Sequence, residues 1–326
     1  MFAAKGFITG AATVRALGEL VMEVGDQDLG IQDIRNQLAQ RGSLAKAMAV
    51  SWPEIRAGMD AATAQIPLAE GTAITAGEFG GVRSEEVILA GSAPKGTVLY
   101  LHGGGYVMGG PQTHRGLTSR LAKVAGASVV TIDYRLAPEH PFPAALDDAE
   151  AAYRALLARQ PAQSIVVAGD SAGGGLSLAL ALRLKLAGLP QPAGIFVISP
   201  WTDLEQSSET CTTKADADPI ISREGLDGMA SAYLNGADAR DPLASPLHGN
   251  YAGVAPILIQ VGADEVLLGD SVSLSLAAGA AGAAVRLEIW PEMIHVWHSF
   301  ADRMAPAREA IAVAAQWIAD QLSARA

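Results

Sequence analysis

The chain has 326 residues, of which 50% are hydrophobic and 17% are charged, so it is typical of a globular protein long enough to bury a large core. Its formal net charge of −11 argues against nucleic acid or an anionic membrane surface as a partner. Cys211 is the only cysteine, which excludes an intrachain disulfide and a cysteine-based metal site.

The predicted elements fall into a helical start and a long alternating part. The first 70 residues are expected to hold helices only, with Ile31–Ala39 and Trp52–Ala64 the clearest. From about Gly71, apolar strands alternate with helices, after a probable hairpin at the start. Strands are expected at Gly71–Phe79, Val82–Ala90, Gly96–Leu101, Ala127–Tyr134, Ser164–Ala168, Ala193–Ser199, Ala255–Val261 and Val285–Trp290, and helices at Thr113–Ala125, Leu146–Arg159, Leu176–Leu186, Ser271–Ala281 and Ala307–Leu322. Continuous apolar strands separated by helices predict an α/β fold, with a mostly parallel sheet covered on both faces.

One long segment interrupts this alternation. Thr202 to Tyr251 is a polar, helix-leaning segment of about fifty residues. It must emerge at the carboxyl ends of the strands, where ligands bind in open α/β sheets. We therefore expect residues 1–70 and about 202–250 to form a cap over that edge of a catalytic domain that spans residues 71–326.

The stretch "IVVAGDSAGGGL" (residues 165–176) places Ser171 between two glycines, after an apolar strand and before a helix. Glycine two residues before and two residues after a serine is typical of a turn too tight for a Cβ at either side, which exposes the hydroxyl as a nucleophile. The alternative is a glycine-rich loop that only caps a helix.

A serine nucleophile needs a base and a carboxylate that orients the base. In this order of elements they should follow the last two strands, which predicts Asp264 in "GADEVLLGD" as the acid and His295 in "PEMIHVWHSF" as the base. Glu265 and Asp270 are the alternative carboxylates, and His298 is the alternative base.

The stretch "HGGGYVMGG" (residues 102–110) follows the first long parallel strand. Gly103, Gly104 and Gly105 leave backbone N–H groups bare, and the N–H of Ala172 points into the same space, so these four are the expected donors to a developing oxyanion. A flexible turn or a phosphate-binding loop is the alternative, but the glycine spacings typical of nucleotide sites are not present.

Together, "HGGGYVMGG", "GDSAGG" and "DYRLAPEHPFPAALDD" (residues 133–148) resemble the hormone-sensitive-lipase family of microbial carboxylesterases, in its GDSAG branch. The resemblance runs from about Gly71 to the C-terminus. It implies an α/β-hydrolase fold with an eight-stranded sheet and a helical cap, a triad of Ser171, Asp264 and His295, and oxyanion donors among Gly103–Gly105 and Ala172. The family often has Asp-Pro-Leu-x-Asp around the acid, and "DEVLLGD" departs from that pattern.

The function expected is therefore that of a serine carboxylesterase, which hydrolyses short- to medium-chain esters through an acyl-enzyme and needs no metal or organic cofactor. Hydrolysis of lactones by the same triad and non-catalytic ligand binding on a hydrolase scaffold are the alternatives. Five large apolar residues could wall an acyl pocket or pack the cap against the sheet: Trp52, Ile55, Met59, Trp201 and Met229. Because no apolar run reaches roughly 18 residues and no clear signal-peptide core is present, we expect a cytoplasmic monomer or homodimer without stable membrane association.

Overall fold

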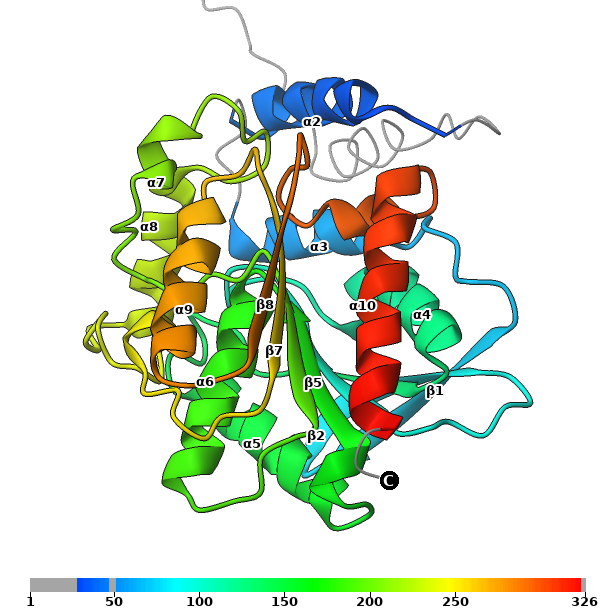
Figure 1. Ribbon diagram of the computed structural model, residues 1–326. Coiled ribbons are helices and arrows are strands. Elements are labelled where there is room, and N and C mark those ends of the chain that lie inside the picture. Colours follow the sequence, from blue (N-terminus) through cyan, green and yellow to red (C-terminus); the bar gives the residue numbers. More distant parts are fainter. Residues whose placement is uncertain (1–27, 47–50, 324–326) are drawn as a thin grey trace, which may run out of the picture.

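The sheet of the computed structural model has eight strands in the order β1-β2-β4-β3-β5-β6-β7-β8 (Figure 1). The structure describes residues 28–46 and 51–323. The pairs β1–β2 and β2–β4 are antiparallel, and every later pair is parallel. The predicted α/β-hydrolase fold, with an antiparallel start and a parallel remainder, is confirmed.

The elements follow the predicted alternation. The strands are β1 (Thr72–Phe79), β2 (Val82–Leu89), β3 (Thr97–Leu101), β4 (Ser128–Ile132), β5 (Ile165–Asp170), β6 (Gly194–Ile198), β7 (Ile257–Gly262) and β8 (Val285–Trp290). The helices are α2 (Ile31–Lys46), α3 (Trp52–Thr63), α4 (Pro111–Ala125), α5 (Ala144–Leu157), α6 (Ala172–Leu186), α7 (Thr210–Thr213), α8 (Arg223–Leu234), α9 (Leu268–Ala280) and α10 (Ala305–Ser323). Short 3-10 turns lie at Ala162–Ser164, Pro246–His248 and Trp297–Phe300.

The central strands are mostly apolar because both faces of the sheet are covered. Every residue of β3, β4, β5, β6 and β7 is buried. Helices α4 and α10 pack on one face, and α5, α6 and α9 pack on the other (Figure 1). β8 lies at the edge of the sheet and is only half-buried. The core thus fixes the carboxyl ends of β3, β5, β7 and β8 along one edge.

Two helices, α6 and α9, begin three or more residues earlier than the sequence predicted. α6 begins at Ala172 rather than Leu176 because its glycines allow close packing: a Cβ on Gly173 would lie 2.0 Å from the carbonyl oxygen of Leu101, and one on Gly175 would lie 2.1 Å from that of Trp201. α9 begins at Leu268 rather than Ser271. Asp270 is therefore not the N-cap that the sequence suggested, and its buried Oδ2 accepts hydrogen bonds from residues 202 and 203 instead.

The described parts of the two segments expected to form the cap contact the loops after the parallel strands. α2 crosses the upper end of the molecule in Figure 1, with α3 beneath it. Arg35 of α2 contacts Asp264, and Arg56 of α3 donates to the carbonyl of Val107. α8, within the insertion, contributes Tyr233 to the core cluster that also holds Ala172. The first 27 residues of the expected cap lie outside the described residues.

Candidate active site

Ser171 lies in a strained turn between β5 and α6. Its φ is 53° and its ψ is −123°, a conformation that L-residues rarely adopt. A Cβ on Gly169 would lie 2.4 Å from the carbonyl oxygen of Gly173, and one on Gly173 would lie 2.0 Å from that of Leu101. The flanking glycines are therefore required by close backbone packing, as predicted. The Ser171 N–H donates to the carbonyl of Ile198 at 2.9 Å, which ties the turn to β6.

The glycine loop after β3 provides two free backbone donors rather than three. Gly104 and Gly105 have φ values of 118° and 62°, which favour glycine. Among the described residues, neither of their N–H groups has a hydrogen-bond partner, and the same holds for Ala172 at the first position of α6.

The N–H of Gly103 points elsewhere. It donates to Asp170 Oδ1 at 3.1 Å. A group already bound to a buried carboxylate is not available to a substrate oxygen, so the geometry contradicts the expectation for Gly103. The free N–H groups of Gly104, Gly105 and Ala172 are the candidate donors to one oxyanion.

His295 lies in the loop after β8 and faces a buried carboxylate. Its Nδ1 is 3.3 Å from Glu265 Oε1, and the two side chains are 5% and 0% exposed. Burial lowers the pKa of His295, but the hydrogen bond to Glu265 and its negative charge, together with the charges of Asp218 and Asp170, outweigh burial and raise that pKa. This leaves Nε2 as the ring nitrogen for proton exchange.

The carboxylate that contacts His295 is therefore not Asp264, which the sequence favoured, but Glu265, the next residue. Glu265 Oε2 accepts hydrogen bonds from the Ser199 hydroxyl at 2.8 Å and from the Gly262 N–H at 3.1 Å. These contacts fix the carboxylate against the carboxyl ends of β6 and β7.

Asp264 points away from the histidine. Its carboxylate lies 2.8 Å from Arg35 and 3.3 Å from Lys214, and its side chain is 30% exposed. The turn after β7 brings residue 265, not residue 264, to the inner side of the site.

His298, the alternative base, is engaged elsewhere. Its Nε2 lies 2.9 Å from Gln260 Oε1, and it is fully buried. Burial lowers the pKa of His298 to about 3, against a small opposing effect of the Asp170 charge. A ring held neutral and bonded to an amide does not serve as the base of this site.

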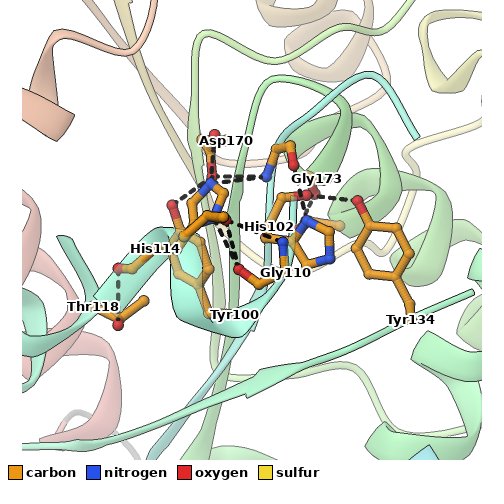
Figure 2. A network of polar contacts seen from close by, with 11 residues as sticks. Tyr100, His102, Gly110, His114, Thr118, Tyr134, Asp170 and Gly173 are labelled. Carbon is orange, nitrogen blue, oxygen red and sulfur yellow. Dashed lines mark hydrogen bonds and ion pairs between the residues drawn. The ribbon is translucent and has the colours of Figure 1, made fainter. Parts of the chain in front are cut away.

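A buried polar network that the sequence did not predict lies behind the glycine loop. Figure 2 shows Tyr100 and His114 converging on Asp170, the residue directly before Ser171. The Tyr100 hydroxyl donates to Asp170 Oδ1 at 2.8 Å, and His114 Nε2 lies 3.3 Å from the same oxygen. The aspartate within "GDSAG" was the available signal for this network.

The Asp170 and His114 side chains form an ion pair. Burial raises the pKa of Asp170, but the charge of His114 and hydrogen bonds from His114 and Tyr100 outweigh burial and lower it. Burial lowers the pKa of His114, but the charge and hydrogen bond of Asp170 outweigh burial and raise it. The two shifts agree in sense, since each favours the charged form of its group.

His102, which opens the glycine motif, has a structural position. Its ring stacks on the Tyr134 ring with the centroids 4.0 Å apart, and its Nδ1 lies 2.8 Å from the carbonyl oxygen of Gly103. The Tyr134 hydroxyl donates to the carbonyl of His102 at 2.7 Å. Burial and the neighbouring charge of His114 lower the pKa of His102 to about 3. These contacts stabilise the start of the glycine loop.

The large apolar residues of the cap divide into two groups. Trp201 is fully buried and donates its Nε1 to the carbonyl of Asp203, so it packs in the core. Met229 of α8 lies against the glycine loop, since a Cβ on Gly105 would be 2.0 Å from its sulfur. Trp52, Ile55 and Met59 of α3 are half-buried. Met229 thus contacts the glycine loop directly.

One group of side chains in the described part of the chain brings metal-ligand atoms together. Atoms of Asp203, Glu205 and His248 lie within 4.8 Å of one another. Asp203 already accepts hydrogen bonds from the N–H groups of Glu205 and Ser207, and Arg240 lies 3.8 Å from Glu205. The Asp203 carboxylate of this group is therefore already occupied by donors of the chain itself. Within residues 28–46 and 51–323, no helix has the length and apolar character to cross a membrane.

Comparison with known proteins identifies the family. A family model described as alpha/beta hydrolase fold matches residues 98–299. A solved structure titled as a hormone-sensitive lipase from a metagenome library is 41% identical, with a TM-score of 0.89, over 91% of this chain and 100% of its own. An esterase of the bacterial hormone-sensitive lipase family is 37% identical, with a TM-score of 0.87, over 90% of this chain and 98% of its own. The chain belongs to the bacterial hormone-sensitive lipase family.

A curated relative gives the class of reaction. An acetyl-hydrolase of Streptomyces hygroscopicus is 48% identical over 68% of this chain and 75% of its own length. With the esterase structures, it makes this member of the hormone-sensitive lipase family a carboxylic ester hydrolase.

Proposed function

We propose that the protein is a serine carboxylesterase in which Ser171 is the nucleophile, His295 the general base and Glu265 the carboxylate that orients it. The observation that carries this proposal is the buried contact between His295 Nδ1 and Glu265 Oε1. It is supported by the strained turn at Ser171, because the carboxyl ends of β5, β7 and β8 lie along the same edge of the sheet.

In the first half-reaction, Ser171 Oγ attacks the ester carbonyl carbon and gives its proton to His295 Nε2. The negative charge of Glu265 stabilises the imidazolium that forms. The carbonyl oxygen becomes an oxyanion, which accepts hydrogen bonds from the N–H groups of Gly104, Gly105 and Ala172. His295 then protonates the leaving alkoxide, and the acyl group stays on Ser171.

In the second half-reaction, water replaces the alcohol. His295 takes a proton from the water as it attacks the acyl-enzyme, and the same donors stabilise the second oxyanion. Collapse of this intermediate returns the proton to Ser171 and releases the carboxylic acid. The atoms balance as one ester and one water to one acid and one alcohol.

We propose further that residues 1–70 and about 202–250 act as a cap that limits the substrate to short- and medium-chain esters. Met229 supports this, because its side chain lies against Gly105, one of the proposed oxyanion donors. A substrate carbonyl in that position has limited space on the side of α8. The name acetyl-hydrolase carried by the Streptomyces relative is consistent with a short acyl group.

Three variants test the triad with a matched pair of neighbouring carboxylates. Ser171→Ala is expected to lower kcat by on the order of 10⁶. Glu265→Gln is expected to lower it by on the order of 10⁴, because the amide favours the wrong histidine tautomer. Asp264→Asn is expected to cost less than about tenfold, since it does not touch the histidine. A large loss for Asp264→Asn with nearly full activity for Glu265→Gln would restore the assignment that the sequence favoured.

A further inference from the structure

Helix α2 packs directly on the loop that carries His295. Ile34 of α2 is fully buried in the same core cluster as Met293, Ile294 and Val296, which flank the histidine. The N–H of Leu29, just before the helix, donates to the carbonyl of Arg303 at 2.8 Å. Arg35, the residue after Ile34, therefore lies beside the loops that follow β7 and β8. α2 itself crosses the upper end of the molecule (Figure 1).

The guanidinium of Arg35 joins three separate parts of the chain. Its Nη1 donates to the carbonyl of Ala217 at 2.5 Å. Its Nη2 donates to Asp264 Oδ2 at 2.8 Å and to the carbonyl of Glu292 at 3.0 Å. The Arg35 side chain is only 18% exposed. One side chain of the N-terminal segment thus holds the insertion after β6, the loop after β7 and the loop after β8.

Two of the residues that accept from Arg35, Asp264 and Glu292, lie close in sequence to Glu265 and His295. Asp264 directly precedes Glu265, and its N–H donates to the carbonyl of Met293, two residues before His295. Glu292, three residues before His295, has a φ of 63°, so its carbonyl is fixed in a strained turn.

The contact of Arg35 with Ala217 fixes the backbone next to Asp218, which binds the loop that carries Glu265. Asp218 Oδ2 accepts a hydrogen bond from the N–H of Val266 at 2.9 Å, and Val266 directly follows Glu265. The insertion is thereby tied to the backbone of the acid loop on the side opposite Asp264.

We propose that Arg35 is a positioning residue that holds the Glu265 and His295 loops at their reacting distance, with Asp264 as its counter-ion. This inference rests on the proposed function. The Glu265–His295 contact of 3.3 Å is longer than the roughly 2.7–2.9 Å of a strong charge-assisted hydrogen bond, so a small shift of either loop breaks it. A planar guanidinium can serve three acceptors at fixed angles, whereas an ammonium at this site acts as a point charge.

Arg35 is also open to small solutes. An open cavity of about 460 Å³ is lined by Arg35, Ala217, Asp264 and Glu292, among others. Neither Ser171 nor His295 is among the described residues of its wall. A guanidinium ion can therefore enter the space left by a truncated side chain without entering the reaction site.

The test compares Arg35→Ala and Arg35→Lys with Arg308→Ala, measuring kcat and KM for p-nitrophenyl butyrate. Arg308 is the matched control because it pairs with Asp28 of the same N-terminal segment, while its contact in the segment after β8 is with the carbonyl of Ala301, six residues beyond His295. Arg35→Ala is expected to lower kcat by about 10- to 100-fold and to change KM by less than about threefold, the pattern of misplaced catalytic groups. Arg35→Lys should be intermediate and Arg308→Ala close to the parent.

Chemical rescue provides a readout that a purely structural role would not move. Guanidinium chloride at tens of millimolar is expected to restore part of the kcat of Arg35→Ala, while sodium chloride at the same concentration is not. If Arg35→Ala does not fold, Asp264→Asn replaces it, with kcat expected to fall about three- to tenfold.

Three results would overturn the inference: kcat of Arg35→Ala within twofold of the parent, an equal loss in Arg308→Ala, or rescue by sodium chloride alone. If Asp264→Asn has to be used in place of Arg35→Ala, an unchanged kcat for that variant would also overturn the inference. Failure of the proposed function is distinguishable, since it would appear as full activity of Ser171→Ala or no esterase activity in the parent.

Discussion

The Asp170→Asn substitution is expected to destabilise the protein by about 3 kcal/mol. The Asp170 carboxylate receives three contacts, from the Tyr100 hydroxyl, the Gly103 N–H and His114 Nε2. Hydrogen bonds to a charged group contribute about 1.5–3 kcal/mol and neutral ones about 0.5–1.5 kcal/mol, so each contact loses about 1 kcal/mol when the charge is removed. The sum lies at the lower end of the roughly 3–5 kcal/mol measured when one partner of a buried ion pair is removed.

The cost of this substitution should depend on pH in a defined direction. The pKa of His114 is raised in the folded protein, so its contribution is complete below its unfolded pKa of about 6.5 and is lost as the pH rises through the folded pKa. The pKa of Asp170 is lowered, so its contribution is present above its unfolded pKa of about 3.9 and is lost as the pH falls through the folded one. The pair therefore stabilises most between about pH 4 and 6.5.

Urea unfolding of the parent, Asp170→Asn, His114→Gln and the double variant at several pH values measures both effects. The cost of Asp170→Asn should be largest near pH 5.5, should shrink as the pH rises, and should be smaller in the His114→Gln background, since the residues interact directly. A free energy of unfolding within about 0.5 kcal/mol of the parent at pH 5.5 would refute the reasoning. A cost that does not vary with pH would refute the ion pair in particular.

Further predictions concern the reaction, the packing and the substrate. Because the pKa of His295 is raised and a general base must be neutral, kcat/KM should fall on the acid side with a midpoint above the usual value of about 6.5; a midpoint below it would contradict the Glu265 contact. Gly173→Ala should cost at least about 3 kcal/mol of unfolding free energy, since its Cβ meets the backbone of Leu101. Gly279→Ala, with nothing within 4 Å of its Cβ, should be neutral or stabilising in the same assay. Across p-nitrophenyl esters of two to sixteen carbons, kcat/KM should peak at or below about eight carbons, and Met229→Ala should shift the peak to longer chains. A steady rise to the longest ester would show a lipase. Much higher activity on lactones would favour a lactone hydrolase.

The sequence predicted those parts of the site that depend on strands and tight turns. The serine turn was recognisable because two glycines at fixed spacing indicate a backbone that excludes a Cβ. A Cβ on Gly169 would lie 2.4 Å from the carbonyl oxygen of Gly173, and one on Gly173 would lie 2.0 Å from that of Leu101. The parallel strands were recognisable because burial on both faces makes them continuously apolar. These are local properties, so one sequence is enough to read them.

The predictions about the site that were wrong concern residues whose contacts are with distant segments of the chain. Asp264 and Glu265 are adjacent in sequence, and only the path of the turn after β7 decides which carboxylate faces His295. The N–H of Gly103 is taken by Asp170, 67 residues away, which no loop composition can reveal. Arg35 comes from a helix in which Ile34 is the one buried residue among positions 31–38, so its own neighbourhood does not signal a contact 229 residues away.

The close packing at the start of α6 has a consequence for engineering. Side chains at positions 173, 174 and 175 would meet backbone or proline atoms at 2.0, 2.9 and 2.1 Å, so mutational libraries directed at this turn will consist mainly of unfolded variants. Met229, by contrast, presents the end of a flexible thioether to the glycine loop and belongs to a helix whose Gly228 has open space around it. Substrate range in this enzyme is therefore best altered from α8, where side-chain volume can change while the backbone around the nucleophile stays fixed.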